Sequence, residues 1–307
     1  MKAVIYTEYG PPDVLQLQEV AKPTPGNHDV LVKIRATSVT IGDVRMRKFD
    51  VPRMQWLFAR LYLGILKPKR PILGMEIAGE VEAVGAAVTR FKPGDEVFAS
   101  TLSVGIGGYA QYKCMPEDAV MAFKPAHVTF EEAAAGPATG GITALLNLRK
   151  AGVHSGQRIL IYGASGSVGT FAVQLAKDAG AYVTGVCSAA NLDMVKCLGA
   201  DEVIDYTQED FTRNGETYDL VFDAVGKLPS SLGKKALNKT GVYLNVNSSS
   251  GKITSDDLTR LKELMEAGKI RSVIDRCYPL EATADAHRYV EQGHKKGNVA
   301  IIVNHSN

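Results

Sequence analysis

The clearest chemical signal in the chain is a glycine-rich stretch, Ile161-Tyr162-Gly163-Ala164-Ser165-Gly166-Ser167-Val168-Gly169. It lies where a short apolar strand, 158–162, ends and a helical stretch, 168–179, begins, which is the context of a dinucleotide-binding turn. Gly166 has no side chain, so a pyrophosphate can approach the backbone, and Gly169 lets the helix pack closely on the sheet. The helix start offers free N–H groups and a positive dipole end. We therefore expect a phosphate site from Ala164 to Gly169; the alternative is a glycine-rich loop without a ligand.

The end of the next strand distinguishes the two nicotinamide cofactors. NAD sites usually have an acidic residue there, which accepts a hydrogen bond from the ribose 2′-hydroxyl. This chain instead reads Val186-Cys187-Ser188-Ala189-Ala190-Asn191. Ser188 and Asn191 can hydrogen-bond a 2′-phosphate without repelling it, although both residue types also cap helices. NADPH is therefore expected as the cofactor in preference to NADH.

The secondary structure predicted for the elements that position these residues changes near residue 120. Before it, β-rich runs are separated by glycine and proline, a pattern typical of a compact, partly open β-barrel; the runs are 3–7, 30–36, 76–84 and 94–99. After about residue 130, strands alternate with helical stretches, which predicts a doubly wound parallel sheet with helices on both faces. The expected strands are 158–162, 181–187, 202–206, 219–223 and 242–246, and the expected helices are 168–179, 191–198, 230–237 and 256–267. Strand character returns at 273–275 and 299–303.

The composition narrows the class of protein. The 307 residues are enough for about two domains, and 45% hydrophobic with 22% charged residues is typical of soluble globular chains. Lys plus Arg number 35 against 33 for Asp plus Glu, which argues against nucleic acid or a membrane as the main partner but leaves a local basic patch open. The apolar stretch 54–66 is too short to span a bilayer. Four scattered cysteines and the lack of a signal peptide favour a cytoplasmic location.

Several further motifs accompany the phosphate turn. They include Gly74-Met75-Glu76-Ile77-Ala78-Gly79, Phe91-Lys92-Pro93-Gly94-Asp95, Gly107-Gly108-Tyr109-Ala110, Leu198-Gly199-Ala200-Asp201 and Phe222-Asp223-Ala224-Val225-Gly226. In combination they resemble the medium-chain dehydrogenase/reductase superfamily, specifically its zinc-free quinone oxidoreductase-like branch, over essentially the whole chain. The resemblance implies a Rossmann dinucleotide-binding domain over residues 121–267. It would be inserted into a GroES-like domain, formed by residues 1–120 and completed by 268–307.

The resemblance also implies further cofactor contacts. By the family pattern, Tyr206 lies near the adenosine ribose or its 2′-phosphate, and Val225 and Gly226 line the dinucleotide with their backbone. Val246 and Asn247 approach the nicotinamide side, and Asn298 in the tail is a further cofactor contact.

The family pattern also indicates which chemistry to expect. Zinc-dependent relatives use a Cys, a His followed by Glu, and a later Cys or acid; the matching positions here hold Thr40, Met75 and Thr139, which are poor zinc ligands. Without a metal to polarise a simple carbonyl, a quinone or an α,β-unsaturated carbonyl is the expected hydride acceptor, because its π-system spreads the developing charge. The expected function is NADPH-dependent reduction of such a substrate. Two alternatives stay open: a zinc-independent alcohol or aldehyde oxidoreductase, and a non-catalytic NADPH-binding redox sensor.

The candidate catalytic residues follow from the same comparison. Thr40 takes the place of the branch's usual asparagine, Asp43 matches its following acid, and Lys296 is another candidate proton donor. Tyr62 lies in the apolar segment 56–63, which is expected to form a lid or wall over a flat substrate, or else ordinary packing or a partner surface.

The oligomeric state is left open by the sequence. Similar proteins have a longer stretch where this chain has only 247–255, and that stretch helps to form their dimer. We therefore consider both a homodimer and a monomer.

Overall fold

The computed structural model describes residues 1–52, 56–248 and 251–305, and at Tyr62 the backbone alone. The chain forms two compact units: Met1–Ala138 together with Ile274–Asn307, and Thr139–Val273. Helix α3 (Phe130–Ala134) belongs to the first unit because it packs on strands β3, β4 and β14 of that unit. Among the described residues, no helix has the length and apolarity needed to cross a membrane.

The first unit is mainly antiparallel sheet. In the described part of the chain, its main sheet has the order β13-β14-β3-β4-β5-β7, with β6 also paired to β3, and β1 and β2 form a separate ribbon. The strands are β1 (Lys2–Ile5), β2 (Gln16–Glu19), β3 (Asp29–Val39), β4 (Glu76–Val84), β5 (Glu96–Ser100), β6 (Tyr112–Pro116), β7 (Met121–Phe123), β13 (Ile274–Pro279) and β14 (Asn298–Ile302). The helices besides α3 are α1 (Ile41–Lys48), α2 (Trp56–Leu63) and α9 (Thr283–Glu291). All four β-rich runs expected before residue 120 are therefore strands.

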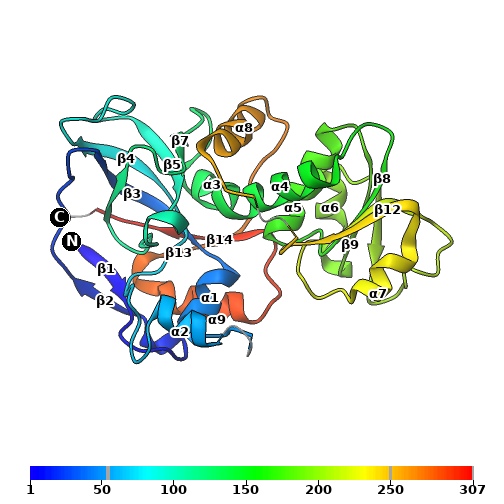
Figure 1. The fold of residues 1–307 in the computed structure, drawn as a ribbon, viewed down its shortest axis with the longest axis horizontal. Helices are drawn as coiled ribbons and strands as arrows, with labels where there is room; N and C mark the ends of the chain where they lie inside the picture. The colour runs from blue at the N-terminus through cyan, green and yellow to red at the C-terminus, as the bar shows by residue number, and fades with distance from the viewer. Residues whose placement is uncertain (53–55, 249–250, 306–307) are drawn as a thin grey trace. The chain divides into compact units, whose positions relative to one another are not determined.

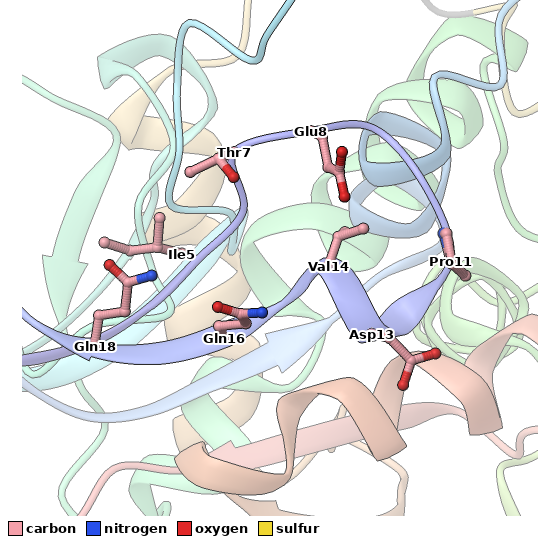
Figure 2. A pocket seen from close by; sticks show the side chains of 8 residues that line it. All are labelled: Ile5, Thr7, Glu8, Pro11, Asp13, Val14, Gln16 and Gln18. Atoms are coloured by element: carbon pink, nitrogen blue, oxygen red, sulfur yellow. The ribbon is translucent and has the colours of Figure 1, made fainter.

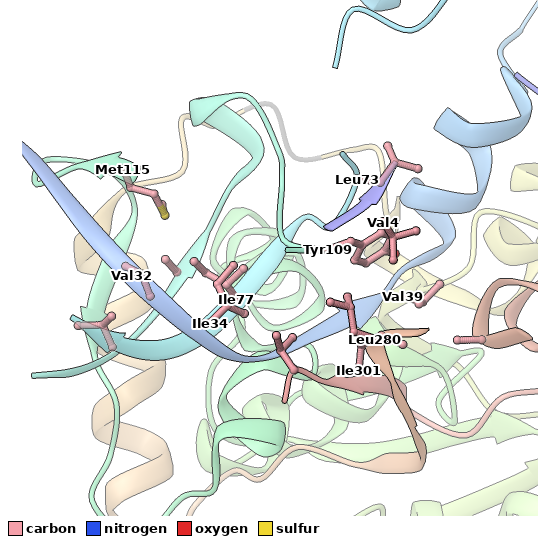
Figure 3. Packing of buried hydrophobic residues seen from close by; sticks show 14 of the residues in the cluster. Val4, Val32, Ile34, Val39, Leu73, Ile77, Tyr109, Met115, Leu280 and Ile301 are labelled. Atoms are coloured by element: carbon pink, nitrogen blue, oxygen red, sulfur yellow. The ribbon is translucent and has the colours of Figure 1, made fainter. Parts of the chain in front are cut away.

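The core of the first unit follows from the two-residue alternation of its strands. Val30, Val32 and Ile34 on β3 are fully buried, and Ile77 on β4 faces the same interior. Figure 3 shows Ile34 beside Ile77, and Leu280 near Ile301. Because Leu280 and Ile301 come from the tail, the end of the chain completes this core.

The second unit is a parallel sheet with helices packed on it. Its order over the described residues is β10-β9-β8-β11-β12, and every neighbouring pair is parallel. The strands are β8 (Arg158–Tyr162), β9 (Tyr182–Cys187), β10 (Glu202–Asp205), β11 (Tyr218–Asp223) and β12 (Leu237–Asn245), and the helices are α4 (Ile142–Ala151), α5 (Ser167–Asp178), α6 (Leu192–Cys197), α7 (Ser230–Gly233) and α8 (Ser255–Glu266). After β10 the chain returns across the sheet to β11, on the other side of β8, so the strand order switches between β8 and β11. Parallel sheets bind ligands at the strand ends beside such a point.

The strand–helix alternation expected from the sequence is confirmed, with one notable difference. Strand β12 begins at Leu237, whereas the sequence predicts helix up to that residue and strand only from 242. A register shift opposite Tyr218 and Leu220 of β11 accommodates the early start of β12. Since β12 is the last strand of the described sheet, its Val242 stays 43% exposed. The homodimer remains a prediction.

Candidate active site

The phosphate turn is built on a glycine that no other residue can replace without strain. Gly163 has φ = 78°, and a Cβ there would lie 2.6 Å from Val225 Cγ1. The backbone N–H groups of Gly163 and Ala164 both donate to the carbonyl oxygen of Val186, at 2.9 and 3.0 Å. These bonds tie the end of β8 to the end of β9, so the turn leaves the sheet in a defined direction.

The next glycines have opposite surroundings. A Cβ on Gly166 would meet nothing closer than the Gly163 carbonyl oxygen at 3.5 Å, whereas a Cβ on Gly169 would lie 2.1 Å from that same oxygen. Gly166 is the N-cap of α5, with no side chain capping the helix, and its carbonyl accepts the first helical bond from Thr170 at 2.9 Å. The first N–H groups of a helix have no intrahelical partner and attract anions. Gly166 therefore borders an open anion cradle, and Gly169 closes the packing behind it.

A small polar cluster lies beside this cradle, at the ends of β8 and β9. The Asn191 side-chain amide donates to Ser165 Oγ at 3.3 Å and to Ser188 Oγ at 3.1 Å. Because both hydroxyl oxygens accept from Asn191, their own protons remain available to a ligand oxygen. Asn191 Oδ1 is buried and has no hydrogen-bond partner, so it offers an acceptor to a ligand hydroxyl. These contacts agree with the cofactor role expected for Ser188 and Asn191, which remains a prediction.

Tyr206 extends this cluster on the side of β10. Its backbone N–H donates to the Cys187 carbonyl at 3.2 Å, and its ring centre lies 6.3 Å from that of Tyr162. Its side chain is 53% exposed. An exposed ring next to the last residue of β8 is suited to contact an adenosine.

On the other side of the turn, Asp223 anchors the loop after β11. Its Oδ1 accepts from the N–H groups of Val225 at 3.1 Å and Gly226 at 2.9 Å, and its Oδ2 accepts from Leu228 N–H at 2.9 Å. Gly226 has φ = 70°, and Val246 lies close to it, with Cγ2 3.3 Å from the position a Gly226 Cβ would take. Asp223 therefore positions the segment expected to line the dinucleotide.

Replacing this anchor is expected to destabilise the second unit. Asp223→Asn keeps the size of the side chain, but it replaces one carboxylate oxygen by an NH2 group. That group cannot accept a hydrogen bond from the backbone N–H that faces it. We expect the free energy of unfolding to fall by about 1–3 kcal/mol, the cost of leaving buried donors unsatisfied. Urea unfolding measures it. Asp210→Asn, at an exposed turn outside this loop, is the control, and an equal loss in both variants would contradict the anchoring role.

In the first unit, Thr40 and Asp43 form one interlocked pair at the start of α1. Thr40 N–H and Oγ–H donate to Asp43 Oδ2 at 3.0 and 2.6 Å, and Asp43 N–H donates back to Thr40 Oγ1 at 3.1 Å. This is a capping box, in which helix and cap satisfy each other's backbone groups. Gly74 N–H adds a bond to Asp43 Oδ1 at 2.9 Å. Burial raises the pKa of Asp43 to about 6, although hydrogen bonds from Thr40, Gly74 and Tyr109 act in the opposite direction.

The positions that hold zinc ligands in zinc-dependent relatives carry other residue types in this chain. Thr40 Oγ1 lies 3.4 Å from Met75 Sδ, so the two residues contact each other. Glu76 corresponds to the Glu of the His-Glu pair in zinc-dependent relatives. Its Oε1 accepts hydrogen bonds from Ser38 Oγ–H at 2.5 Å and from Gly136 N–H at 3.0 Å. The described residues contain no group of three or more His, Cys, Asp or Glu side chains that could hold a metal. The residues at these positions do not fit a catalytic zinc ion.

The tail contributes a half-buried lysine with a lowered pKa that the sequence does not reveal. Burial lowers the pKa of Lys295 to about 8, while the charges of Asp275 and Glu76 raise it. The neighbouring Lys296, which the sequence suggests as a proton donor, is instead exposed at its side chain, and its backbone N–H donates to Asp275 Oδ2 at 3.0 Å. Asn298 is buried against Gly136, where a Cβ would lie 2.7 Å from the Asn298 side chain. In the sequence, the only sign of a role for Lys295 is the pair of lysines that precedes Gly297.

A second buried pair was also missed from the sequence. Tyr109 and His287 are fully buried, and Tyr109 Oη lies 3.1 Å from His287 Nε2. Burial lowers the pKa of His287 to about 3, so this imidazole is neutral at physiological pH. Because Tyr109 also supports the Asp43 carboxyl group, the pair belongs to the surroundings of Asp43.

The structure does not bring all expected residues to these sites. The phosphate turn contains Ala164, Ser165, Gly166, Ser167, Val168 and Gly169, and Val225 lies beside it, next to Gly163. Gly226 and Val246 lie close to each other after the ends of β11 and β12. Asn247 is exposed, and its backbone N–H donates to Asn245 Oδ1 at 2.9 Å. The side chain of Tyr62 lies outside the described part of the chain, so its expected substrate role stays a prediction.

A hollow of about 230 Å³ lies elsewhere in the first unit, between β1 and the segment that leads to β2. Figure 2 shows its lining, which includes Glu8 and Asp13. It shares no residue with the sites above. Asp13 is held in an ion pair with Arg288, and we assign the hollow no function.

Together, a parallel sheet with a dinucleotide-type turn and a β-rich unit completed by the tail define the two-part class of nucleotide-dependent dehydrogenases and reductases. Comparisons with known proteins agree with this class. Residues 26–125 match the alcohol dehydrogenase GroES-like domain, and residues 198–256 and 234–301 match the zinc-binding dehydrogenase family. The chain belongs to the medium-chain dehydrogenase/reductase superfamily, in its quinone oxidoreductase-like branch. The expected fold, a Rossmann domain inserted into a GroES-like domain, is thereby confirmed.

Individual relatives cover nearly the whole chain. The chain is 34% identical to the chloroplastic quinone-oxidoreductase QR1 of Triphysaria versicolor, over 98% of both sequences. It is 31% identical to the chloroplastic NADPH-dependent alkenal/one oxidoreductase of Arabidopsis thaliana, over 98% of this chain and 79% of the relative. The solved structure of the Coxiella burnetii quinone oxidoreductase superposes with a TM-score of 0.83 at 27% identity, covering 99% of each chain.

Proposed function

We propose that this protein is an NADPH-dependent reductase that transfers hydride to a quinone or an α,β-unsaturated carbonyl without a catalytic metal. Relatives named quinone oxidoreductase and alkenal/one oxidoreductase support the substrate class. The observation that carries the proposal is the open cradle at Gly166, flanked by two serine hydroxyls held by Asn191. This arrangement combines an anion site for a diphosphate with donors for a further phosphate.

The residues of the second unit fit a nicotinamide dinucleotide. The diphosphate would contact the backbone from Ser165 to Gly169, and the adenosine side would contact Ser188, Asn191 and Tyr206. We assign the 2′-phosphate to the Ser165 and Ser188 hydroxyls, because these donors are available and a carboxylate does not follow β9 directly. Bound NADPH supplies a hydride from its nicotinamide ring.

The proposed role of the first unit is to supply the proton. Reduction of a quinone or enone leaves negative charge on oxygen, which a positioned acid can neutralise. Thr40 Oγ1 is half-buried and 2.6 Å from Asp43 Oδ2. When Asp43 is protonated, it donates to Thr40 Oγ1, and the Thr40 hydroxyl proton passes to the substrate oxygen. Because Asp43 is fully buried, it then regains its proton from solvent by way of the half-buried Thr40 hydroxyl.

The proposal is tested by following NADPH oxidation against a para-quinone, an ortho-quinone, an enone and an aldehyde. We expect turnover with the conjugated acceptors, slower turnover with the aldehyde, and a lower KM for NADPH than for NADH. A chelator should leave the rates unchanged, since Thr40 and Met75 occupy the ligand positions. Alcohol-dependent reduction of NADP would favour the alcohol oxidoreductase instead, and tight NADPH binding without turnover on any acceptor would favour the redox sensor.

A further inference from the structure

Helix α2 of the first unit presents its apolar side to solvent. Leu57 is 61% exposed, Phe58 is 75% exposed, and Leu61 is 52% exposed. After the helix, Ile65 is 60% and Leu66 92% exposed. Figure 1 shows α2 at the margin of this unit. Contiguous exposed apolar surface of this kind usually marks an interaction site, whereas single exposed apolar residues do not.

The polar side chain of the helix faces the protein instead. Arg60 is the one charged residue of Trp56–Leu63. Its guanidinium lies 3.8 Å from the ring centre of Phe49 and 5.0 Å from that of Tyr9, and Nη1 donates to the Ile65 carbonyl at 3.0 Å. Arginine stacks well on aromatic faces, so these contacts hold the helix with Leu57, Phe58 and Leu61 outward. A surface helix in water normally has the opposite orientation.

The charged residues within this helix and directly after it are all basic. Between Val51 and Met75 the sequence has five basic residues and no acidic one: Arg53, Arg60, Lys67, Lys69 and Arg70. Lys67 and Lys69 are exposed directly after Leu66, and Lys69 Nζ donates to the Leu61 carbonyl at 2.7 Å. We expected no membrane partner from the near-zero net charge of the whole chain. That average hides the local excess of basic residues in this segment.

We propose that α2 and the loop to Arg70 bind the surface of an anionic lipid bilayer. The helix lies in the interface with Leu57, Phe58, Leu61 and Leu66 among the acyl chains, and Lys67 and Lys69 lie at the headgroups. An apolar helix face combined with adjacent cations is the pattern of interfacial binding, and the two contributions together give stable attachment. A protein partner of ordinary composition matches the apolar face, whereas an anionic bilayer also matches the exposed lysines beside it. The proposal is independent of the reductase activity.

The chain carries its own probe for this surface, because Trp56 is its single tryptophan and is 48% exposed at the start of α2. Fluorescence is recorded with vesicles of phosphatidylcholine alone and with vesicles that also contain phosphatidylserine. We expect a blue shift with the anionic vesicles that weakens in high salt, and quenching by lipids brominated on the acyl chain. Phe58→Ser should weaken partitioning about tenfold or more, since a buried phenyl group is lost. Lys67→Gln should weaken it about fivefold.

Matched variants elsewhere make the test specific. Val242→Ser removes an exposed apolar side chain from β12, and Lys252→Gln removes an exposed cation from the second unit; both should partition like the parent chain. Thermal unfolding confirms that each variant is folded. Unchanged Trp56 emission with anionic vesicles would overturn the proposal. So would a blue shift that needs no lipid and accompanies a doubled mass in light scattering, which indicates a second copy. An effect of Phe58→Ser on the KM for the quinone alone would assign the helix to the substrate.

Discussion

Gly166→Ala is expected to fold as well as the parent chain. It should bind NADPH about 10- to 100-fold more weakly, because crowding between the new methyl group and the diphosphate costs roughly 1–3 kcal/mol. The new methyl group meets only ordinary contacts, at 3.5 Å to the Gly163 carbonyl oxygen and 4.0 Å to Val225 Cγ1. The backbone φ of −83° suits alanine. The methyl group therefore projects into the space that a diphosphate needs rather than into the protein. Titration of NADPH fluorescence measures the affinity.

Gly169→Ala is the matched comparison within the same turn. Its methyl group would lie 2.1 Å from the Gly163 oxygen and 2.8 Å from two backbone atoms of Ala164. Backbone cannot rotate out of the way, so we expect a loss of stability of about 1–3 kcal/mol or more in urea unfolding. The two glycines thus separate binding from folding. If Gly166→Ala retained full affinity for NADPH, the diphosphate would not rest on this turn.

Thr40→Val is expected to lower kcat for the quinone about 100-fold or more, the usual contribution of a positioned acid. Valine keeps the shape of threonine but has no hydroxyl to pass a proton. It also removes the cap of α1, which costs about 1 kcal/mol of stability, so unfolding is measured in parallel. Thr40→Ser keeps both hydroxyl and cap and should retain most of the activity. Equal kcat in Thr40→Val and the parent chain would exclude this hydroxyl as the donor.

The pH dependence follows from the raised pKa of Asp43. The carboxyl group must be protonated to donate to Thr40, so kcat should fall as the pH rises through about 6. Asp43→Asn should lose this ionisation from the pH profile. A profile that keeps an ionisation near pH 6 in Asp43→Asn would assign it to another group.

The same shift has a consequence for stability. In the folded chain the pKa is raised from 3.8 to about 6, so between these values the folded state holds a proton that the unfolded state has released. The free energy of unfolding therefore falls as the pH rises through this window. In Asp43→Asn this part of the pH dependence should be absent.

The features that could be predicted from the sequence are those decided by neighbours in the chain. The turn at Gly163–Gly169 needs particular residues at fixed spacing, so it was found directly, and strand β8 was placed at its observed bounds. The early start of β12 was missed because pairing with β11 overrides the local helical pattern. Sheet pairing is tertiary, and no window of sequence contains it.

The chemistry of buried groups was harder to predict for the same reason. The sequence placed Asp43 as a candidate, but its pKa depends on Gly74, Tyr109 and the surrounding core. Lys295 looks no different from Lys296 in the sequence, yet only Lys295 is desolvated. Arg60 looks like the polar face of α2, and only the aromatic rings of Tyr9 and Phe49 reveal that it faces the protein.

The position of β14 bears on how the chain folds as it is synthesised. This strand is inserted between β13 and β3, and its residues Val299 and Ile301 are part of the core of the first unit. The residues of β3 leave the ribosome early, but their partner strand emerges only after the entire second unit. The second unit is continuous in sequence and can fold during translation, since domains generally fold as units. The N-terminal part of the first unit must meanwhile wait with Ala36–Val39 of β3 unpaired on the side that β14 later occupies, because β6 covers only Asp29–Lys33 there. Nascent-chain chaperones would protect this unpaired stretch in the meantime.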